Sequence, residues 1–257
     1  MNERSNRCER HTSLALLLIP LVLFLAACDD PAAPDYRYRL TVEVETPEGL
    51  KTGSSVIEVE QTLGRAGASP ANSQIYRKAR GEAVAVDLPG GQTLFALLRS
   101  ESDIEWAETV AARVAAMSGR GSSPGRFDAA LNLVGPAEVP RTFPAYKFIE
   151  KRSAYPMLVT FGDIDDPTSV ERVDPDDLAA SFGEGVKLKR ITVQLTDDPV
   201  TTGIEGRFGW WDRIEDSGGG LVPMTKNDRG RWEVALGFDE GLVDVGLSNF
   251  STEAFKQ

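Results

Sequence analysis

The sequence predicts an α+β protein built mainly from antiparallel β-sheet, with a few short helices. Three patterns lead to this prediction. Apolar and polar residues alternate over 36–45, which is typical of a half-buried strand. The same alternation returns at 84–88, before the turn-forming triplet Pro89-Gly90-Gly91. Residues 104–117 instead repeat their apolar side chains at helical spacing.

The N-terminal elements are predicted as strands joined by turns. Residues 46–53 contain Pro47 and two glycines and predict a turn, so the strand predicted at 55–61 becomes a hairpin partner of the first strand. The polar, poorly periodic residues 62–81 predict a long loop. A further strand is predicted at 93–98, after the Pro-Gly-Gly turn.

The next segment predicts an amphipathic helix. Ser102 and Glu105 have the spacing of a capping box, and Gly119 is placed to end the helix. One face would carry apolar side chains, those of Ile104, Ala107, Val110, Ala111, Val114 and Met117. The opposite face would carry Glu101, Glu105 and Glu108.

A proline-rich stretch, 135–144, is the predicted boundary between two parts of the body. Residues 36–134 would form a β-rich part with one amphipathic helix, and residues 145–257 an α+β part. The two parts could also be one domain.

Within the C-terminal part, strands are predicted at 157–161, 186–196 and 231–238. The alternation in the second of these changes phase, which predicts a β-bulge near Lys189. A short helix is predicted between Asp174 and Gly183, because a capping acid and a proline open it and a glycine closes it.

The N-terminal residues carry the pattern of an exported precursor. Three arginines precede the apolar run 14–25, which is shorter than the roughly 20 residues that a membrane-spanning helix needs. The run ends in Leu25-Ala26-Ala27-Cys28. This layout resembles the lipobox of bacterial lipoproteins. The resemblance implies a signal peptide over 1–27 and acyl chains on Cys28. The segment that follows holds two prolines and three aspartates and little to bury, which predicts a flexible tether over 28–35.

The same resemblance implies a location, the periplasmic side of a membrane in the bacterial cell envelope. Asp29, directly after the lipidated cysteine, resembles an inner-membrane retention signal, but the choice between inner and outer membrane stays open. Two segments of the body, 36–59 and 177–204, are similar to segments of uncharacterised proteobacterial hypothetical proteins. That group carries no activity that could be transferred.

Composition excludes several kinds of chemistry. Cleavage would remove Cys8 and His11, the only histidine, and lipidation would block Cys28. The mature chain would then lack the groups for Ser-His-Asp or Cys-His catalysis and for ordinary zinc sites. We expect no cofactor and no metal site.

The acidic balance bears on partners. The formal net charge of −11 disfavours nucleic acid as a partner. It also predicts repulsion from anionic headgroups, so membrane contact is predicted through the N-terminal acyl chains.

Three further patterns invite functional interpretations. Residues 121–125 match the G-x-S-x-G motif of serine hydrolases, but without a histidine base a surface loop is the better interpretation. The acids between Asp163 and Asp174 suggest calcium, yet they fail the EF-hand pattern, and a solvated loop with helix caps is favoured. Adjacent Trp210 and Trp211 point to different sides, so either both are in the core or one is exposed for a partner.

Together these observations favour a lipid-anchored, non-enzymatic binding or assembly module with an envelope protein or sugar as partner. The alternative is an anchored, carboxylate-based glycoside hydrolase that acts on envelope sugars, since paired acids need no histidine. A cleft with two facing acids, one of them desolvated, would favour the hydrolase. An apolar patch on a flat surface would favour the binding module.

Overall fold

The computed structural model describes residues 34–65, 73–117, 128–144 and 152–255. Residues 33–257 form one compact unit. Its strands are β1 (Tyr36–Thr46), β2 (Gly49–Arg65), β3 (Ser73–Arg80), β4 (Val84–Asp87), β5 (Thr93–Ala96), β6 (Ala137–Glu138), β7 (Thr142–Phe143), β8 (Arg152–Ser153), β9 (Leu158–Phe161), β10 (Val170–Arg172), β11 (Lys187–Leu195), β12 (Met224–Lys226) and β13 (Trp232–Val234). Its α-helices are α1 (Trp106–Met117), α2 (Ala179–Phe182) and α3 (Trp211–Asp216).

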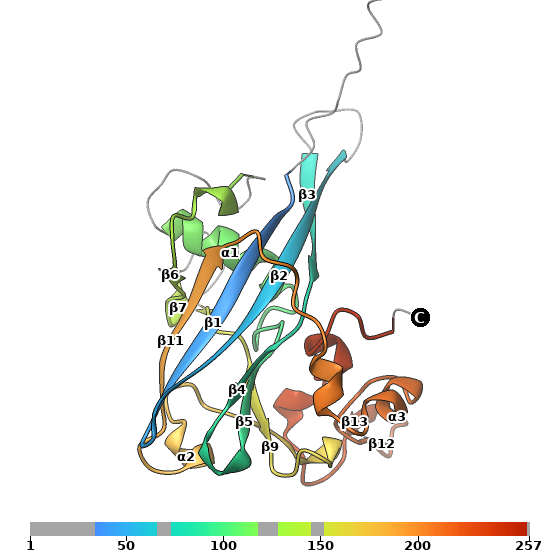
Figure 1. Ribbon diagram of the computed structural model, residues 1–257. Helices are drawn as coiled ribbons and strands as arrows, with labels where there is room; N and C mark the ends of the chain where they lie inside the picture. Colours follow the sequence, from blue (N-terminus) through green and yellow to red (C-terminus); the bar gives the residue numbers. More distant parts are fainter. Residues whose placement is uncertain (1–33, 66–72, 118–127, 145–151, 256–257) are drawn as a thin grey trace, which may run out of the picture. The chain divides into compact units, whose positions relative to one another are not determined.

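Two antiparallel sheets organise these elements, so the predicted mainly antiparallel α+β fold is confirmed (Figure 1). The larger sheet has the strand order β3-β2-β1-β11-β6, and the smaller sheet has the order β10-β9-β5-β4. Two short ribbons, β12-β13 and β7-β8, complete the described strands. Strands from both sides of the predicted 135–144 boundary enter both sheets, and that stretch itself contains β6 and β7.

The first core lies between the two sheets and under α1. Alternate residues of β1, from Tyr36 to Val44, are buried there together with Leu94 and Ala96 of β5. Two polar atoms are satisfied inside this core. The Tyr38 hydroxyl donates to the carbonyl of Ala107 at 2.7 Å, and the Trp106 indole donates to the carbonyl of Ala154 at 2.8 Å.

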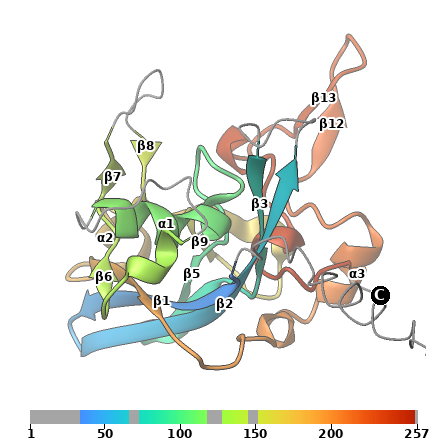
Figure 2. The ribbon, with the colours of Figure 1, turned by 90° about the horizontal axis from the view of Figure 1, so that it is seen from above.

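The second core lies on the opposite face of the smaller sheet and is closed by the C-terminal segment (Figure 2). Phe95 and Phe161 supply the sheet side, and Phe208, Trp211 and Phe250 supply the other side. Neighbouring rings in this cluster lie 4.7–6.0 Å apart between centroids. The C-terminal segment is held by backbone bonds, from Ala83 N–H to the Phe250 carbonyl at 2.7 Å and from Leu98 N–H to the Asn249 carbonyl at 2.9 Å.

Two predicted loops are strand instead. The turn after β1 is only Pro47-Glu48, and β2 already begins at Gly49. Residues 62–81, predicted as a loop, contain the end of β2 and all of β3. β3 is an edge strand, and none of the residues 75–80 is fully buried. Without a buried face, its sequence shows no apolar alternation to detect.

The predicted amphipathic helix is present, but its first residues and its buried face differ from the prediction. α1 begins at Trp106, and Asp103 rather than Ser102 accepts a backbone hydrogen bond before it, from the Glu105 N–H at 3.0 Å. Ile104 is 71% exposed because it precedes the helix, and Met117 at its end is 47% exposed. The buried face is formed by Trp106 and small residues, which let the helix lie close to the sheet.

The β-bulge predicted near Lys189 is confirmed. Glu43 pairs with Arg190 and Val44 pairs with Leu188, so Lys189 is the extra residue in β11. The bulge brings two consecutive cations to Glu43, at 2.7 Å for Arg190 and 3.6 Å for Lys189. The hydrogen bond from Arg190, together with the charges of Arg190 and Lys189, lowers the pKa of Glu43.

The short elements of the C-terminal part are shorter than predicted. The helix α2 begins only at Ala179, and the strand β13 ends at Val234.

The two sheets approach most closely where β2 crosses β4, and this contact generates a prediction. A Cβ atom on Gly53 would lie 2.1 Å from the carbonyl oxygen of Ala85, a backbone atom that cannot rotate away. Gly53→Ala should therefore lower the free energy of unfolding by about 2 kcal/mol, measured by urea denaturation. Gly206→Ala is the matched control, because nothing lies within 4 Å of its added Cβ. Equal stability of the two variants would contradict this account of the crossing.

A half-buried acid on α1 generates a second prediction. Burial and the nearby charge of Glu105 raise the pKa of Glu108 from 4.5 to about 7, although the Ala79 backbone N–H opposes the shift. A raised pKa means that the stability from this group is complete below pH 4.5 and is lost as the pH rises through 7. Glu108→Gln should thus be more stable than the wild type by about 1 kcal/mol at pH 8 and not at pH 4.5. Urea denaturation at several pH values measures this difference, and exposed Glu184→Gln should show no such trend.

Candidate functional site

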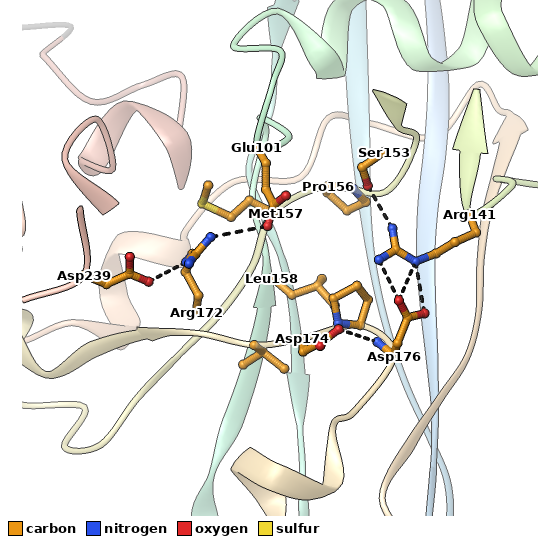
Figure 3. A pocket seen from close by; sticks show the side chains of 12 residues that line it. Glu101, Arg141, Ser153, Pro156, Met157, Leu158, Arg172, Asp174, Asp176 and Asp239 are labelled. Atoms are coloured by element: carbon orange, nitrogen blue, oxygen red, sulfur yellow. Dashed lines mark hydrogen bonds and ion pairs between the residues drawn. The ribbon is translucent and has the colours of Figure 1, made fainter. Parts of the chain in front are cut away.

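A polar cleft of about 430 Å³ opens beside β10, between the loops that leave β5, β8 and β10 (Figure 3). Its volume falls within the range of small-molecule sites. Six charged side chains line it, those of Glu101, Arg141, Arg172, Asp174, Asp176 and Asp239. They come from distant parts of the sequence and meet only because the smaller sheet brings their loops together.

Arg141 forms one end of the cleft. Its guanidinium binds the carboxylate of Asp176 through three N···O contacts of 2.8–3.1 Å and donates to the Ser153 hydroxyl at 3.1 Å. Its other face lies 5.3 Å from the ring centroid of Tyr155. The turn that presents Asp176 is fixed by Asp174, whose carboxylate accepts the Asp176 N–H at 2.8 Å. Arg141 is thus held in one orientation by three neighbours, Asp176, Ser153 and Tyr155.

Arg172 forms the other end of the cleft, at the last position of β10. It binds Asp239 directly and lies 3.5 Å from the carboxylate of Glu101. Asp239 also accepts the backbone N–H of Gly241 at 2.7 Å. Figure 3 shows the two arginine clusters on opposite sides of Leu158. Pro156, Met157, Val173 and Pro175 complete the apolar part of the cleft lining.

Both clusters remain in contact with solvent. The side chains of Arg141 and Arg172 are 41% and 42% exposed, and that of Asp176 is 67% exposed. Exposed ion pairs of this kind contribute about 0–1 kcal/mol to stability. The ion pairs therefore orient the charged groups, but a ligand could replace either partner of a pair at little cost in free energy.

The acids of the cleft with shifted pKa values are shifted toward the ionised form. The hydrogen bond from Arg141 lowers the pKa of Asp176. Burial would raise the pKa of Asp239, but the bonds from Gly241 and Arg172 outweigh it and lower the pKa. A glycosidase also needs an acid that stays protonated near neutrality. The described carboxyls with raised pKa values, those of Glu82 and Glu108, do not line the cleft.

Several residues singled out in the sequence lie outside the described ranges. Cys28 and Asp29 belong to residues 1–33, and the G-x-S-x-G segment belongs to residues 118–127. The structure therefore says nothing of the predicted lipidation, sorting or serine motif.

The acids proposed for calcium serve mainly in turns. Asp163 accepts the Asp165 N–H at 3.0 Å, and Asp166 accepts the N–H and hydroxyl of Thr168 at 2.9 and 2.7 Å. Across the described part of the chain, no group of three or more acidic, histidine or cysteine side chains is placed to hold a metal ion. Asp174 lines the cleft instead.

The tryptophan pair lies in the core, with Trp210 3% and Trp211 5% exposed, which is the first of the two alternatives that the sequence left open. Both are buried because the pair spans the start of α3, with Trp210 at its cap position. The ring of Phe208 lies near both, at 4.7 Å from Trp210 and 5.9 Å from Trp211. The Trp210 indole donates to the carbonyl of Ile164 at 2.8 Å.

Sequence reasoning missed the arginines of the cleft. Arg141 lies in the predicted boundary segment, and Arg172 lies in a strand too short to show periodicity. Asp174 drew attention as a helix-opening acid and as a calcium candidate, and Asp176 follows it in the first turn of the predicted helix. The tertiary pairing of Arg141 with Asp176, 35 residues apart, leaves no local signal.

The comparisons with known proteins find no matching family model, no matching curated protein and no matching solved structure. No helix among the described residues has the length and apolar character to cross a bilayer. The site therefore has to be interpreted from its own geometry.

Proposed function

We propose that this chain is a lipid-anchored protein of the bacterial cell envelope that acts as a non-enzymatic binding module, and that its polar cleft holds a sugar-sized ligand. The proposal that the cleft binds a ligand rests on one observation. An arginine–carboxylate cluster, oriented and exposed to solvent, lies at each of its two ends. The anchor rests on the lipobox-like sequence at Cys28.

The lining suits a ligand with hydroxyl groups. An arginine only donates hydrogen bonds and an ionised carboxylate only accepts them, whereas each sugar hydroxyl does both. Adjacent hydroxyls could thus bridge Arg141 and Asp176, or Arg172 and Asp239, while a ring lies on the apolar side chains of Leu158 and Pro175. Because the existing ion pairs are weak, replacing them by ligand bonds costs little.

The alternative, an anchored glycoside hydrolase, would use two of the same carboxylates. It is supported by the number of acids in the cleft and opposed by the lowered pKa values of Asp176 and Asp239. Release of reducing ends from envelope glycans by the wild type, lost in Asp176→Asn, would establish the hydrolase in place of the binding module.

The anchor is tested at the cysteine. Cys28→Ser should leave an unprocessed precursor, because the sulfur that receives the acyl chains is gone. Mass spectrometry of the wild-type N-terminus should show acylated Cys28 as the first residue. An unmodified Cys28, or a chain that begins elsewhere, would contradict the lipoprotein assignment.

The cleft is tested by removing one donor. Arg141→Gln should weaken binding of soluble oligosaccharides from the envelope at least tenfold by calorimetry, since a charged bidentate donor is lost. The free energy of unfolding should fall by less than about 1 kcal/mol because the pair is exposed. The control is Arg190→Gln, which removes another partly exposed arginine from its pair with a carboxylate, that of Glu43, away from the cleft. Binding that Arg141→Gln leaves unchanged would place the ligand elsewhere.

A further inference from the structure

The β12–β13 hairpin projects from the body of the described unit (Figure 2). Its tip, residues 228–233, is exposed throughout. The turn is well formed, because the Asn227 side chain accepts the N–H groups of Arg229 and Arg231 at 3.0 Å each. A two-stranded ribbon is only marginally stable alone in water. Here its base is supported by Val234, which packs against the second core.

One face of the hairpin is apolar and open to solvent. Lys226 pairs with Trp232 and Met224 with Val234, so these four side chains share one face, whereas Glu233 lies on the other. Trp232 is 64% exposed, in contrast to the three buried tryptophans of the chain. Beyond the ribbon, Leu236 is fully exposed. The Lys226 ammonium lies 4.9 Å from the centroid of the Trp232 ring.

The hairpin has a small positive balance on a strongly acidic protein, because Lys226, Arg229 and Arg231 stand against Asp228 and Glu233. Lys226, Arg229 and Arg231 are all exposed, and none of them forms an ion pair with another residue of the described ranges. Of the two acids, Asp228 is exposed in the turn, and Glu233 is bound by the Asn227 amide at 3.0 Å. The arrangement thus combines unpaired cations with an exposed indole and aliphatic side chains.

We propose that this hairpin is a membrane-docking element, which places Trp232 and Leu236 in the interface of an anionic lipid surface while Arg229 and Arg231 meet the headgroups. Tryptophan favours the headgroup level, where its ring is buried and its N–H stays hydrated. Basic residues beside it add attraction to anionic lipids. The contact is separate from the acyl anchor and does not depend on Cys28.

The net charge of −11 does not prevent this contact. Charges more than about 10 Å from a surface are largely screened at 0.1 M salt. Because the hairpin projects, its cations approach the headgroups ahead of the acidic body (Figure 2). The repulsion expected between the acidic chain and anionic lipid is thus compatible with a local attraction at this hairpin.

The test uses the compact unit, residues 33–257, which lacks Cys28 and hence the acyl chains. Vesicles of phosphatidylcholine with 30% phosphatidylglycerol should bind it in flotation at low salt, and tryptophan emission should shift to the blue. Trp232→Phe should abolish the emission shift, and Arg229→Glu/Arg231→Glu should weaken binding at least tenfold. Pure phosphatidylcholine vesicles should bind the wild type more weakly.

Matched controls are Lys187→Glu, an exposed cation on β11, and Ile104→Ser, an exposed apolar side chain before α1. Both should bind like the wild type. Absence of vesicle binding, or binding that the hairpin variants leave unchanged, would overturn the proposal. It would also be overturned by an emission shift that follows protein concentration without lipid, because Trp232 would then contact a second copy. The vesicle test does not involve Cys28. A negative result for acylation of Cys28 would therefore leave the hairpin proposal intact, and the two tests are distinguishable.

Discussion

The smaller sheet is buried on both faces, and the rest of the structure depends on this constraint. Successive residues of β5 serve different cores, Leu94 and Ala96 the first and Phe95 the second. β9 does the same, with Leu158 in the first core and Phe161 in the second. A shift of either strand by one residue would exchange the two sets of side chains and disrupt both cores at once. The strand register is therefore fixed from two sides.

The candidate cleft and the hairpin both follow from this arrangement. Arg172 lies on β10, the edge strand of the doubly buried sheet, and Leu158 of β9 forms part of the same lining. The hairpin is attached through Val234 to the second core, which the other face of that sheet supports. The polar groups of the cleft and the apolar groups of the hairpin lie in loops and short strands. Both sets are thus supported by the smaller sheet and the cores on its two faces.

The sequence predicted those elements whose side chains divide cleanly between core and solvent. β1 is one case, and the phase change at Lys189 even located the bulge in β11. Prediction failed where the physical cause was tertiary. β3 has no buried face, and Ile104 falls outside the helix that its spacing suggested. Gly53 pairs with Val42 inside the ladder, and the backbone of Ala85 that crosses it, rather than a turn, accounts for the glycine. Asp174 and Asp176 were noticed as acids, but their partner Arg141 is fixed only by the folded chain.

The pairing of β1 with β11 joins two segments separated by more than half of the chain. β1 and β2 form a local hairpin that needs only a two-residue turn, so they can associate early. The other edge of β1 stays open until β11 has been synthesised and has closed a long loop, which makes sheet completion a slow step. During that interval an unpaired strand edge with an apolar face is available to other chains. The order of strands in the larger sheet thus creates a period during folding in which the chain is vulnerable to aggregation.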